Sequence, residues 1–262
     1  MKYIDIHCHL DFPDYDSDRE EVLARMRENE VGAITIGADL ESSKKAVEIA
    51  EANENIWATI GIHPEYSSGF PSPDQGEGRV GFWEEKEFEK LIKSPKVVGI
   101  GECGLDYFRL KDDSIKEKQK KLFEQQIQFA IKHNKPLMLH IRDAYDDALD
   151  ILKNYPGVRG NVHFFAGNIS VAKKFLDLGF TMSFTGVITF THDYDEVIKY
   201  IPQNSIMSET DAPFVAPVPY RGKRNEPLYV IEIVKKMAEI RGENIDILSE
   251  AIINNAKRVF GI

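Results

Sequence analysis

Short apolar runs alternate with amphipathic helical stretches along the whole chain. Runs rich in β-branched and aliphatic residues predict strands, and apolar residues at a helical period predict helices. The predicted strands cover residues 3–10, 31–36, 56–60, 96–101, 136–140, 159–163, 180–184 and 206–209. The predicted helices cover residues 18–29, 42–53, 84–93, 114–133, 144–155, 169–178, 193–200, 227–241 and 245–260, and Ser42 or Ser43 is expected to cap the second.

This order of elements predicts an α/β fold with parallel strands. Strands that are apolar runs need helices on both sides of an open sheet, or a closed barrel. About eight strand–helix units in 262 residues match a single-domain (β/α)8 TIM barrel over residues 1–262. A doubly wound open sheet is the alternative. In a barrel, the active site lies at the C-terminal ends of the strands.

Composition excludes some classes of protein. The net charge of −10 argues against a broad basic surface for duplex DNA, because non-specific affinity comes mostly from neutralising phosphates. It does not exclude a nuclease, since metal ions can supply a local positive field. Two cysteines, Cys8 and Cys103, give no disulfide framework, and neither a secretory signal nor a membrane-spanning run is present. These features predict a soluble cytoplasmic protein with no membrane contact.

Two histidines close the first predicted strand. His7 and His9 are two residues apart, so a strand directs both imidazoles to one face, whereas a helix would direct them apart. Such a pair can offer two nitrogen ligands to one metal ion. Cys8 lies between them and is expected to point the other way, as a packing residue.

Further ligand-type side chains follow other predicted strands. Glu102 follows the fourth strand, His140 ends the fifth, His163 ends the sixth and Asp211 follows the eighth. A barrel would bring all of these to one rim. The competing interpretation makes each a surface polar group, and it needs several coincidences on the same rim. The set therefore predicts a metal site.

The remaining histidines are expected to differ in role. His133 ends a helix, where a cation suits the helix dipole, and His192 lies in a polar loop. His63 follows the third strand, and we expect it to contact substrate or support a ligand rather than to bind metal.

The sequence also contains a glycine pattern and a long loop. Residues 99–104 match G-x-G-x-x-G, but no helix follows directly and a carboxylate lies inside, so a dinucleotide site is not expected. A loop rich in Gly and Pro, from residue 64 to residue 83, is expected to be either a lid or a floppy insertion.

A series of short motifs along the chain resembles those of a known family. In order along nearly the whole chain, the motifs are DIHCH (5–9), GIHP (61–64), GECGLDY (101–107), HIR (140–142), His163, SFTG (183–186), ETDAP (209–213) and RGKRNEP (221–227). This series resembles the TatD family of metal-dependent deoxyribonucleases, which belong to the amidohydrolase-type barrels. One departure is FFAG (164–167), where the family usually has a cysteine after the histidine and a hydroxyl residue before the glycine; a substrate contact is affected rather than the metal site.

The resemblance implies a two-metal site with assigned ligands. By that resemblance, one divalent ion is held by His7, His9 and Asp211 and a second by His140 and His163, with Glu102 bridging the two. Asp211 would also accept a proton from the attacking water as general base, so that Asp211 and Glu102 are the expected catalytic residues. The resemblance implies Mg or Mn, whereas the mixed nitrogen and oxygen ligands suit Zn, Mn or Fe.

Substrate-binding and supporting residues are expected around this centre. Asp5 and Glu209 share strand faces with ligands, so each either orients a ligand or is a hydrogen-bonded polar group of the barrel. Phosphates are expected to be bound by Arg142, Arg221, Lys223 and Arg224, and a base to stack on Tyr107, Phe108 or Phe165.

The expected function is a metal-dependent DNase acting on DNA ends or single strands. A hydrolase of amides, esters or lactones on the same metal site is the alternative, because fold and metals do not fix the scissile bond. A metal-binding protein without turnover is a third hypothesis.

Overall fold

Eight parallel strands form the centre of the molecule. The computed structural model describes residues 1–68 and 83–262. The strands pair in sequence order from β1 to β8, and every described pair is parallel. Their bounds are β1 Tyr3–Cys8, β2 Val31–Ile36, β3 Ile56–Ile60, β4 Val97–Asp106, β5 Leu137–Arg142, β6 Gly160–Val162, β7 Thr181–Phe184 and β8 Ile206–Ser208. The fold class is therefore the predicted TIM barrel.

The barrel closes between its first strand and the segment that follows its last. The N–H of Asp211 donates to the carbonyl of His7 at 2.9 Å, and the N–H of His9 donates to the carbonyl of Ala212 at 2.7 Å. Cys8 and Ala212 form a parallel bridge. Pairing across this seam excludes the open-sheet alternative, whose edge strands would remain unpaired.

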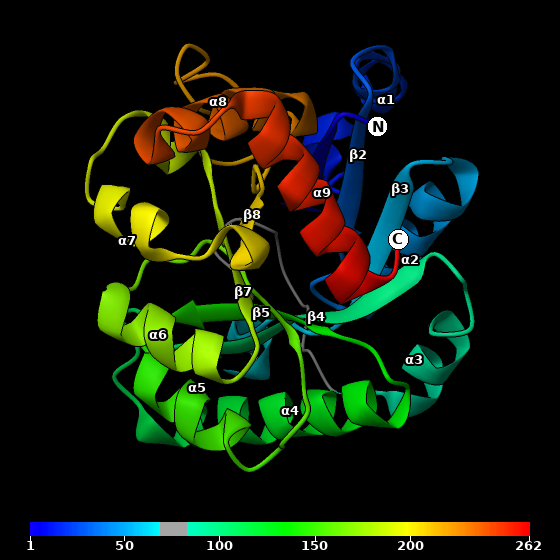
Figure 1. The fold of residues 1–262 in the computed structure, drawn as a ribbon. Helices are drawn as coiled ribbons and strands as arrows, with labels where there is room; N and C mark the ends of the chain where they lie inside the picture. Colours follow the sequence, from blue (N-terminus) through cyan, green and yellow to red (C-terminus); the bar gives the residue numbers. More distant parts are fainter. Residues whose placement is uncertain (69–82) are drawn as a thin grey trace.

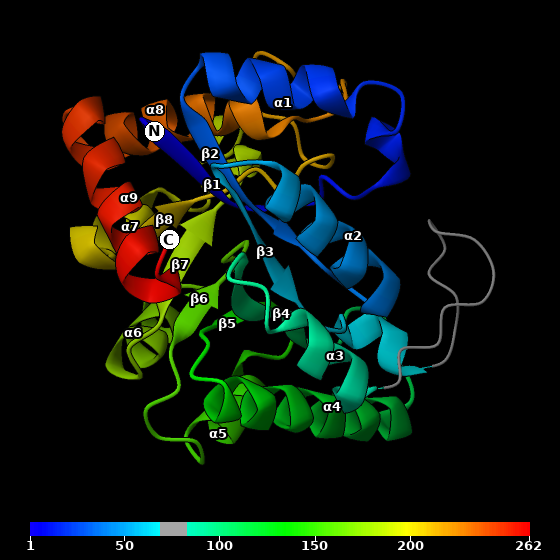
Figure 2. The ribbon, with the colours of Figure 1, turned by 90° about the vertical axis from the view of Figure 1, so that its right-hand side faces the viewer.

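Helices form the outer layer. In both views they lie around the outside of the strands (Figures 1 and 2). Their bounds are α1 Arg19–Glu28, α2 Leu40–Ala52, α3 Glu85–Leu91, α4 Asp113–Lys132, α5 Tyr145–Leu152, α6 Ile169–Asp177, α7 Asp195–Tyr200, α8 Val230–Arg241 and α9 Ile245–Phe260. Because helices cover the strands, β2 and β4 are buried at every position.

Two boundary predictions need correction. The cap of α2 is Asp39, whose carboxylate accepts the Ser42 N–H at 2.7 Å, and Ser42 closes the capping box instead of starting the helix. The predicted helix over residues 227–241 begins as a 3-10 turn at Pro227–Tyr229 before α8.

Strand β4 is longer than predicted. It continues to Asp106, so residues 99–104 lie inside a strand and do not form a turn that opens into a helix. Gly104 has φ +139°, and a Cβ there would lie 2.0 Å from the carbonyl oxygen of His140. A glycine therefore lets β4 approach β5 beside His140.

Two other sequence predictions can be placed. The Gly- and Pro-rich loop for which a lid was considered begins with a 3-10 turn at Pro64–Ser68, and its residues 69–82 lie outside the described residues. Among the helices that are described, none is long and apolar enough to cross a membrane.

Candidate metal centre

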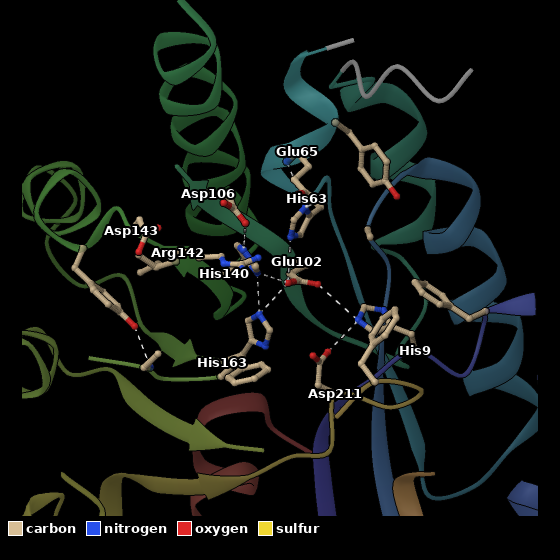
Figure 3. A pocket seen from close by; sticks show the side chains of 18 residues that line it. His9, His63, Glu65, Glu102, Asp106, His140, Arg142, Asp143, His163 and Asp211 are labelled. Carbon is tan, nitrogen blue, oxygen red and sulfur yellow. Dashed lines mark hydrogen bonds and ion pairs between the residues drawn. The ribbon is translucent and has the colours of Figure 1, made fainter. Parts of the chain in front are cut away.

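The carboxyl ends of the strands bring the predicted ligands together. Figure 3 shows Glu102 between two groups of side chains, with His9 and Asp211 on one side and His140 and His163 on the other. The converging side chains are those of His7, His9, Glu102, His140, His163 and Asp211. They come from β1, β4 and β5 and from the residues after β1, β6 and β8. Sequence spacing alone predicted this set.

The first group surrounds one oxygen of Glu102. The Nε2 atoms of His7 and His9 lie 3.5 and 3.8 Å from Glu102 Oε2. The same nitrogens lie 3.7 and 3.6 Å from Asp211 Oδ1. A tetrahedral ion with ligand bonds of about 2.1 Å separates neighbouring ligand atoms by about 3.4 Å. These four atoms therefore have a spacing that suits one ion.

The second group surrounds the other oxygen. Glu102 Oε1 lies 2.8 Å from His140 Nδ1 and 2.9 Å from His163 Nε2, and these two nitrogens are 3.1 Å apart. His63 Nε2 is 3.5 Å from the same oxygen. Each carboxylate oxygen thus has its own set of nitrogen neighbours, an arrangement in which Glu102 can bridge two ions.

His7 provides a test of whether a cation fits. Its ring is fully buried, yet neither ring nitrogen has a hydrogen-bond partner among the described residues. Buried polar atoms without partners are rare in folded proteins. A cation beside Nε2 would satisfy this atom, and Asp211 and Glu102 supply the compensating negative charge. The residues present therefore fit a metal ion.

Burial and neighbouring charges set the protonation of the centre. Burial raises the pKa of Glu102, but His163, His63 and His7 outweigh it and hold that pKa well below its usual range. Burial likewise opposes ionisation of Asp211, and hydrogen bonding to His9 keeps its pKa below the ordinary value. Both carboxylates are therefore ionised at neutral pH, as metal ligands must be.

A second carboxylate lies behind two of the histidines. Glu209 Oε2 is 3.3 Å from His163 Nδ1 and 3.8 Å from His7 Nδ1, and the two rings stack with centroids 3.8 Å apart. Its other oxygen accepts the N–H of Phe164 at 2.5 Å. Glu209 can therefore hold the His163 ring with its Nε2 atom toward Glu102, which corresponds to the first of the two roles considered for it, while His7 Nδ1 is too far away for a hydrogen bond.

Asp5 acts on the backbone. Its carboxylate accepts the N–H of His7 at 3.1 Å and that of Thr210 at 2.9 Å, and it also accepts the Thr210 hydroxyl. Of the two roles predicted for Asp5, the described contacts correspond to the hydrogen-bonded polar group of the barrel. It fastens β1 to the segment carrying Asp211.

Asp106 was missed from the sequence as a functional residue. Its Oδ2 lies 2.8 Å from His140 Nε2, and its Oδ1 accepts the N–H of Phe108 at 2.8 Å. Its backbone is held by the side chain of Gln119 through two hydrogen bonds of 2.9 Å. The contact between Asp106 Oδ2 and His140 Nε2 leaves the other ring nitrogen of His140, Nδ1, facing Glu102. The available signal was the four-residue spacing from Glu102, which places both carboxylates on one strand face.

Five of the six converging residues, all but His7, line a cavity of about 480 Å³. Of the predicted substrate residues, His63 and Arg142 line it. Burial lowers the pKa of His63 to about 3, with a further contribution from His140, so this imidazole is neutral. Two aromatic residues that sequence reasoning did not single out, Phe12 and Phe214, also line the cavity.

Three predicted substrate residues lie elsewhere. The Tyr107 hydroxyl donates to Asp147 Oδ2 at 2.8 Å. The Arg221 guanidinium lies 3.6 Å from the ring centre of Phe190. Arg224 forms a two-pronged ion pair with Asp18, at 2.7 and 2.6 Å.

None of these three side chains lines the cavity, and the Arg224 pair joins the loop after β8 to the start of α1. Lys223 is exposed on that loop, Phe165 is buried, and Phe108 lies beneath Arg142.

Comparison with known proteins gives consistent matches over the whole barrel. The family model described as TatD related DNase matches residues 4–261. The chain is 37% identical over 263 residues to an uncharacterized metal-dependent hydrolase, YabD, from Bacillus subtilis, covering 98% of each protein.

Two solved structures are similar. The crystal structure of YjjV, a TatD homologue from Escherichia coli, has a TM-score of 0.86 and 28% identity, covering 100% of this chain and 98% of that one. A TatD family hydrolase from Entamoeba histolytica has a TM-score of 0.84 and 26% identity, covering 99% and 98% of the two chains.

Proposed function

The chain belongs to the family of TatD related DNases, and from this premise we propose that it hydrolyses phosphodiester bonds of DNA, at strand ends or in single strands. As a member it is a metal-dependent hydrolase, and the proposal concerns the bond that it cleaves. The observation that supports it best is the position of Glu102. Two ions bridged by one carboxylate can bind both the attacking and the leaving oxygen of a phosphodiester.

The proposed ligands form two sets. His7, His9 and Asp211 would hold one divalent ion and His140 with His163 the second, and Glu102 would serve as a ligand to both. Mg or Mn is the proposed metal, and Zn or Fe also suits this set of ligand atoms. When bound, the ions supply positive charge that stabilises the phosphoryl oxygens and lowers the pKa of water at the site.

Asp211 is the proposed general base. Its carboxylate is ionised, lines the cavity and lies within 3.7 Å of the two histidine nitrogens of the first group. It can therefore accept the proton of the attacking water where that water meets the phosphorus. His63 is neutral and also lines the cavity, so its imidazole can donate a hydrogen bond to a phosphate oxygen.

The burial of the candidate metal centre supports a preference for DNA ends and single strands. His7 is fully buried, and Glu102, which lines the cavity, is only 4% exposed. The interior of a duplex cannot enter such a site without unpairing, whereas a single strand or a frayed end can. The net charge of −10 also disfavours a long duplex contact.

A substrate panel tests the proposal. Protein reconstituted with Mg or Mn is assayed on a single strand, a blunt duplex, a closed circular duplex, RNA, small amides and a lactone, with the Glu102→Gln variant as control for contaminating nuclease. We expect single strands and frayed ends to be cleaved fastest and the closed circle to resist. Equal cleavage of the three DNA forms would contradict the preference for ends. Hydrolysis of an amide or lactone, with every phosphodiester left intact, would contradict DNase activity.

A further inference from the structure

Arg142 places a positive charge among the residues that line the cavity, where it interacts electrostatically with the Glu65 carboxylate. It is the last residue of β5, two positions after His140, so the strand directs both side chains to the same face. Its guanidinium is exposed and lies 3.6 Å from the ring centre of Phe108. No ion pair or hydrogen bond to its side chain is formed by any residue that the structure describes. The stacking holds the charge in place and leaves its donors open.

The other charges of the cavity make this position distinctive. Five carboxylates line it, those of Glu65, Glu102, Asp106, Asp143 and Asp211. Arg142 is the only lysine or arginine among the described residues that do so. An anionic group of a ligand that lies outside the metal centre therefore has one cationic partner here, and a guanidinium suits phosphate because it can donate two parallel hydrogen bonds.

An aromatic surface lies on the other side of Glu102. The Phe12 ring is 4.7 Å from that of His9, and the Phe214 ring meets Phe12 edge to face at 5.7 Å. Phe214 is 44% exposed although it is a large apolar side chain. Its backbone is fixed, because its N–H donates to the Asp211 carbonyl at 2.9 Å and its carbonyl accepts the Asn225 amide at 2.6 Å. We call Phe12 and Phe214 the aromatic platform.

These two features flank the metal centre. In Figure 3, Arg142 lies with His140 on one side of Glu102, and His9, the neighbour of the aromatic platform, lies on the other. An exposed aromatic face binds a nucleobase by stacking, without sequence preference. A dinucleotide that carries a terminal phosphate has the matching order: a base, the phosphodiester that reacts, and a second phosphate beyond the next sugar.

We propose that the aromatic platform binds the base on one side of the scissile phosphate and that Arg142 binds the next phosphate on the other side. The inference rests on the proposed function and deepens it, because it makes the substrate a short stretch of strand with one flanking phosphate. Engaging one phosphate beyond the metal centre contributes about −0.7 to the slope of log affinity against log salt concentration.

Binding of non-reacting analogues tests this without relying on turnover. The probe is dithymidine with a P–CH2 linkage that resists hydrolysis, with no terminal phosphate, a 5′ phosphate or a 3′ phosphate. We expect one of the two terminal phosphates to tighten binding to the metal-loaded protein by about tenfold, the size of one charge-assisted contact. Arg142→Gln should abolish that gain, Arg142→Lys should keep part of it, and binding of the unphosphorylated analogue should not change.

Matched variants separate the two subsites. Arg27→Gln removes the same charge from an exposed side chain just before β2, at the opposite end of the barrel, and should behave as wild type. Phe214→Ala should weaken binding of the analogue with two bases by about tenfold. Phe214→Ala should not change the affinity for an analogue without the base that the aromatic platform would bind, which is the base at the end opposite the terminal phosphate that tightens binding.

Three results would overturn the inference. The first is that a terminal phosphate does not tighten binding at either end of the analogue. The second is that Arg142→Gln weakens the binding of all analogues equally. The third is that the carboxylate compound N-acetylglutamate binds through Arg142 as tightly as the phosphorylated analogue does. Failure of the proposed function would be recognised differently. In that case ordinary dithymidine phosphate would not be hydrolysed, whatever the analogues show about binding.

Discussion

At the scale of single residues, Glu102 joins the two ligand groups, because its oxygens face different nitrogens. Replacing one oxygen by an amide nitrogen removes a metal ligand and a negative charge. We expect Glu102→Gln to lower metal content and to abolish hydrolysis, while far-UV circular dichroism stays unchanged. A variant that retains two ions and full activity, by metal analysis and assay, would disprove the bridging role.

Asp211 has two proposed roles that one substitution can separate. Asn can still coordinate through its oxygen but cannot accept a proton. Asp211→Asn should therefore lose most of its activity, by a factor of about 100 to 10,000, even at saturating metal. The measurement is kcat against metal concentration. Complete recovery at high metal would make Asp211 a ligand only.

Asp106 is expected to act through His140. Without its carboxylate, the His140 ring is free to turn or to change tautomer, so Nδ1 is no longer held toward the second group. Asp106→Asn should weaken binding of one of the two ions by about 10- to 100-fold, measured by calorimetric titration of the metal-free protein. Asp146→Asn removes a similar charge from the exposed first turn of α5 and is the control. Equal titration curves for all three proteins would refute the role.

The sequence was informative at residues whose chemical type is unusual at a strand end. Four histidines and two carboxylates at the ends of predicted strands indicated the six candidate ligands without any three-dimensional information. It was uninformative for Arg224, because a basic side chain in a loop gives no sign of its partner. That partner, Asp18, is more than 200 positions away in the chain.

At the scale of elements, the weakest predictions concerned ends. Residues 101–106 of β4 contain two glycines, which dilute the apolar pattern, so the strand was predicted to stop too early. That error also concealed Asp106, because a residue placed in a loop is not expected to share a face with Glu102. The start of α2 was displaced because Asp39 and Ser42 are both good capping residues and only the geometry distinguishes them.

The contact between α1 and the loop after β8 gives a pH prediction. Hydrogen bonding to Arg224 holds the pKa of Asp18 below its usual value. A depressed pKa in the folded state stabilises the protein above the unfolded pKa of about 3.9, and this contribution disappears as the pH falls through the lower folded value. The pair is about a third exposed, so it contributes at most about 1 kcal/mol. In urea unfolding at pH 7, the free energy of unfolding of the wild type should exceed that of Asp18→Asn, and this difference should shrink below about pH 4. A constant difference would exclude this pair as its source.

At the scale of the whole molecule, the fold class followed from the alternation of elements, whereas closure of the barrel did not. Alternation specifies a parallel sheet covered by helices, and both an open sheet and a barrel satisfy it. The choice depends on a few hydrogen bonds between His7–His9 and Asp211–Ala212. Contacts between residues so far apart in the chain leave no local pattern.

Metal binding should stabilise the whole barrel, because the proposed ligands come from strands around its circumference. An ion that binds only the folded state adds RT ln(1 + [L]/Kd), about 2.7 kcal/mol at 100 times Kd. We expect Tm to fall on chelation and to rise again with added Mn, measured by calorimetry. Glu102→Gln should respond much less. A wild-type Tm that is independent of metal would contradict the assignment.

The seam between β1 and β8 has a consequence for how the protein is made. Asp211 is held by the backbone of His7, so the residues that close the barrel also complete the candidate metal centre. During synthesis the two histidines of β1 are made about 200 residues before Asp211, with which they form this seam. A chain that ends before Asp211 therefore lacks one candidate ligand and the seam that closes the barrel, and we expect such a fragment to have no hydrolytic activity.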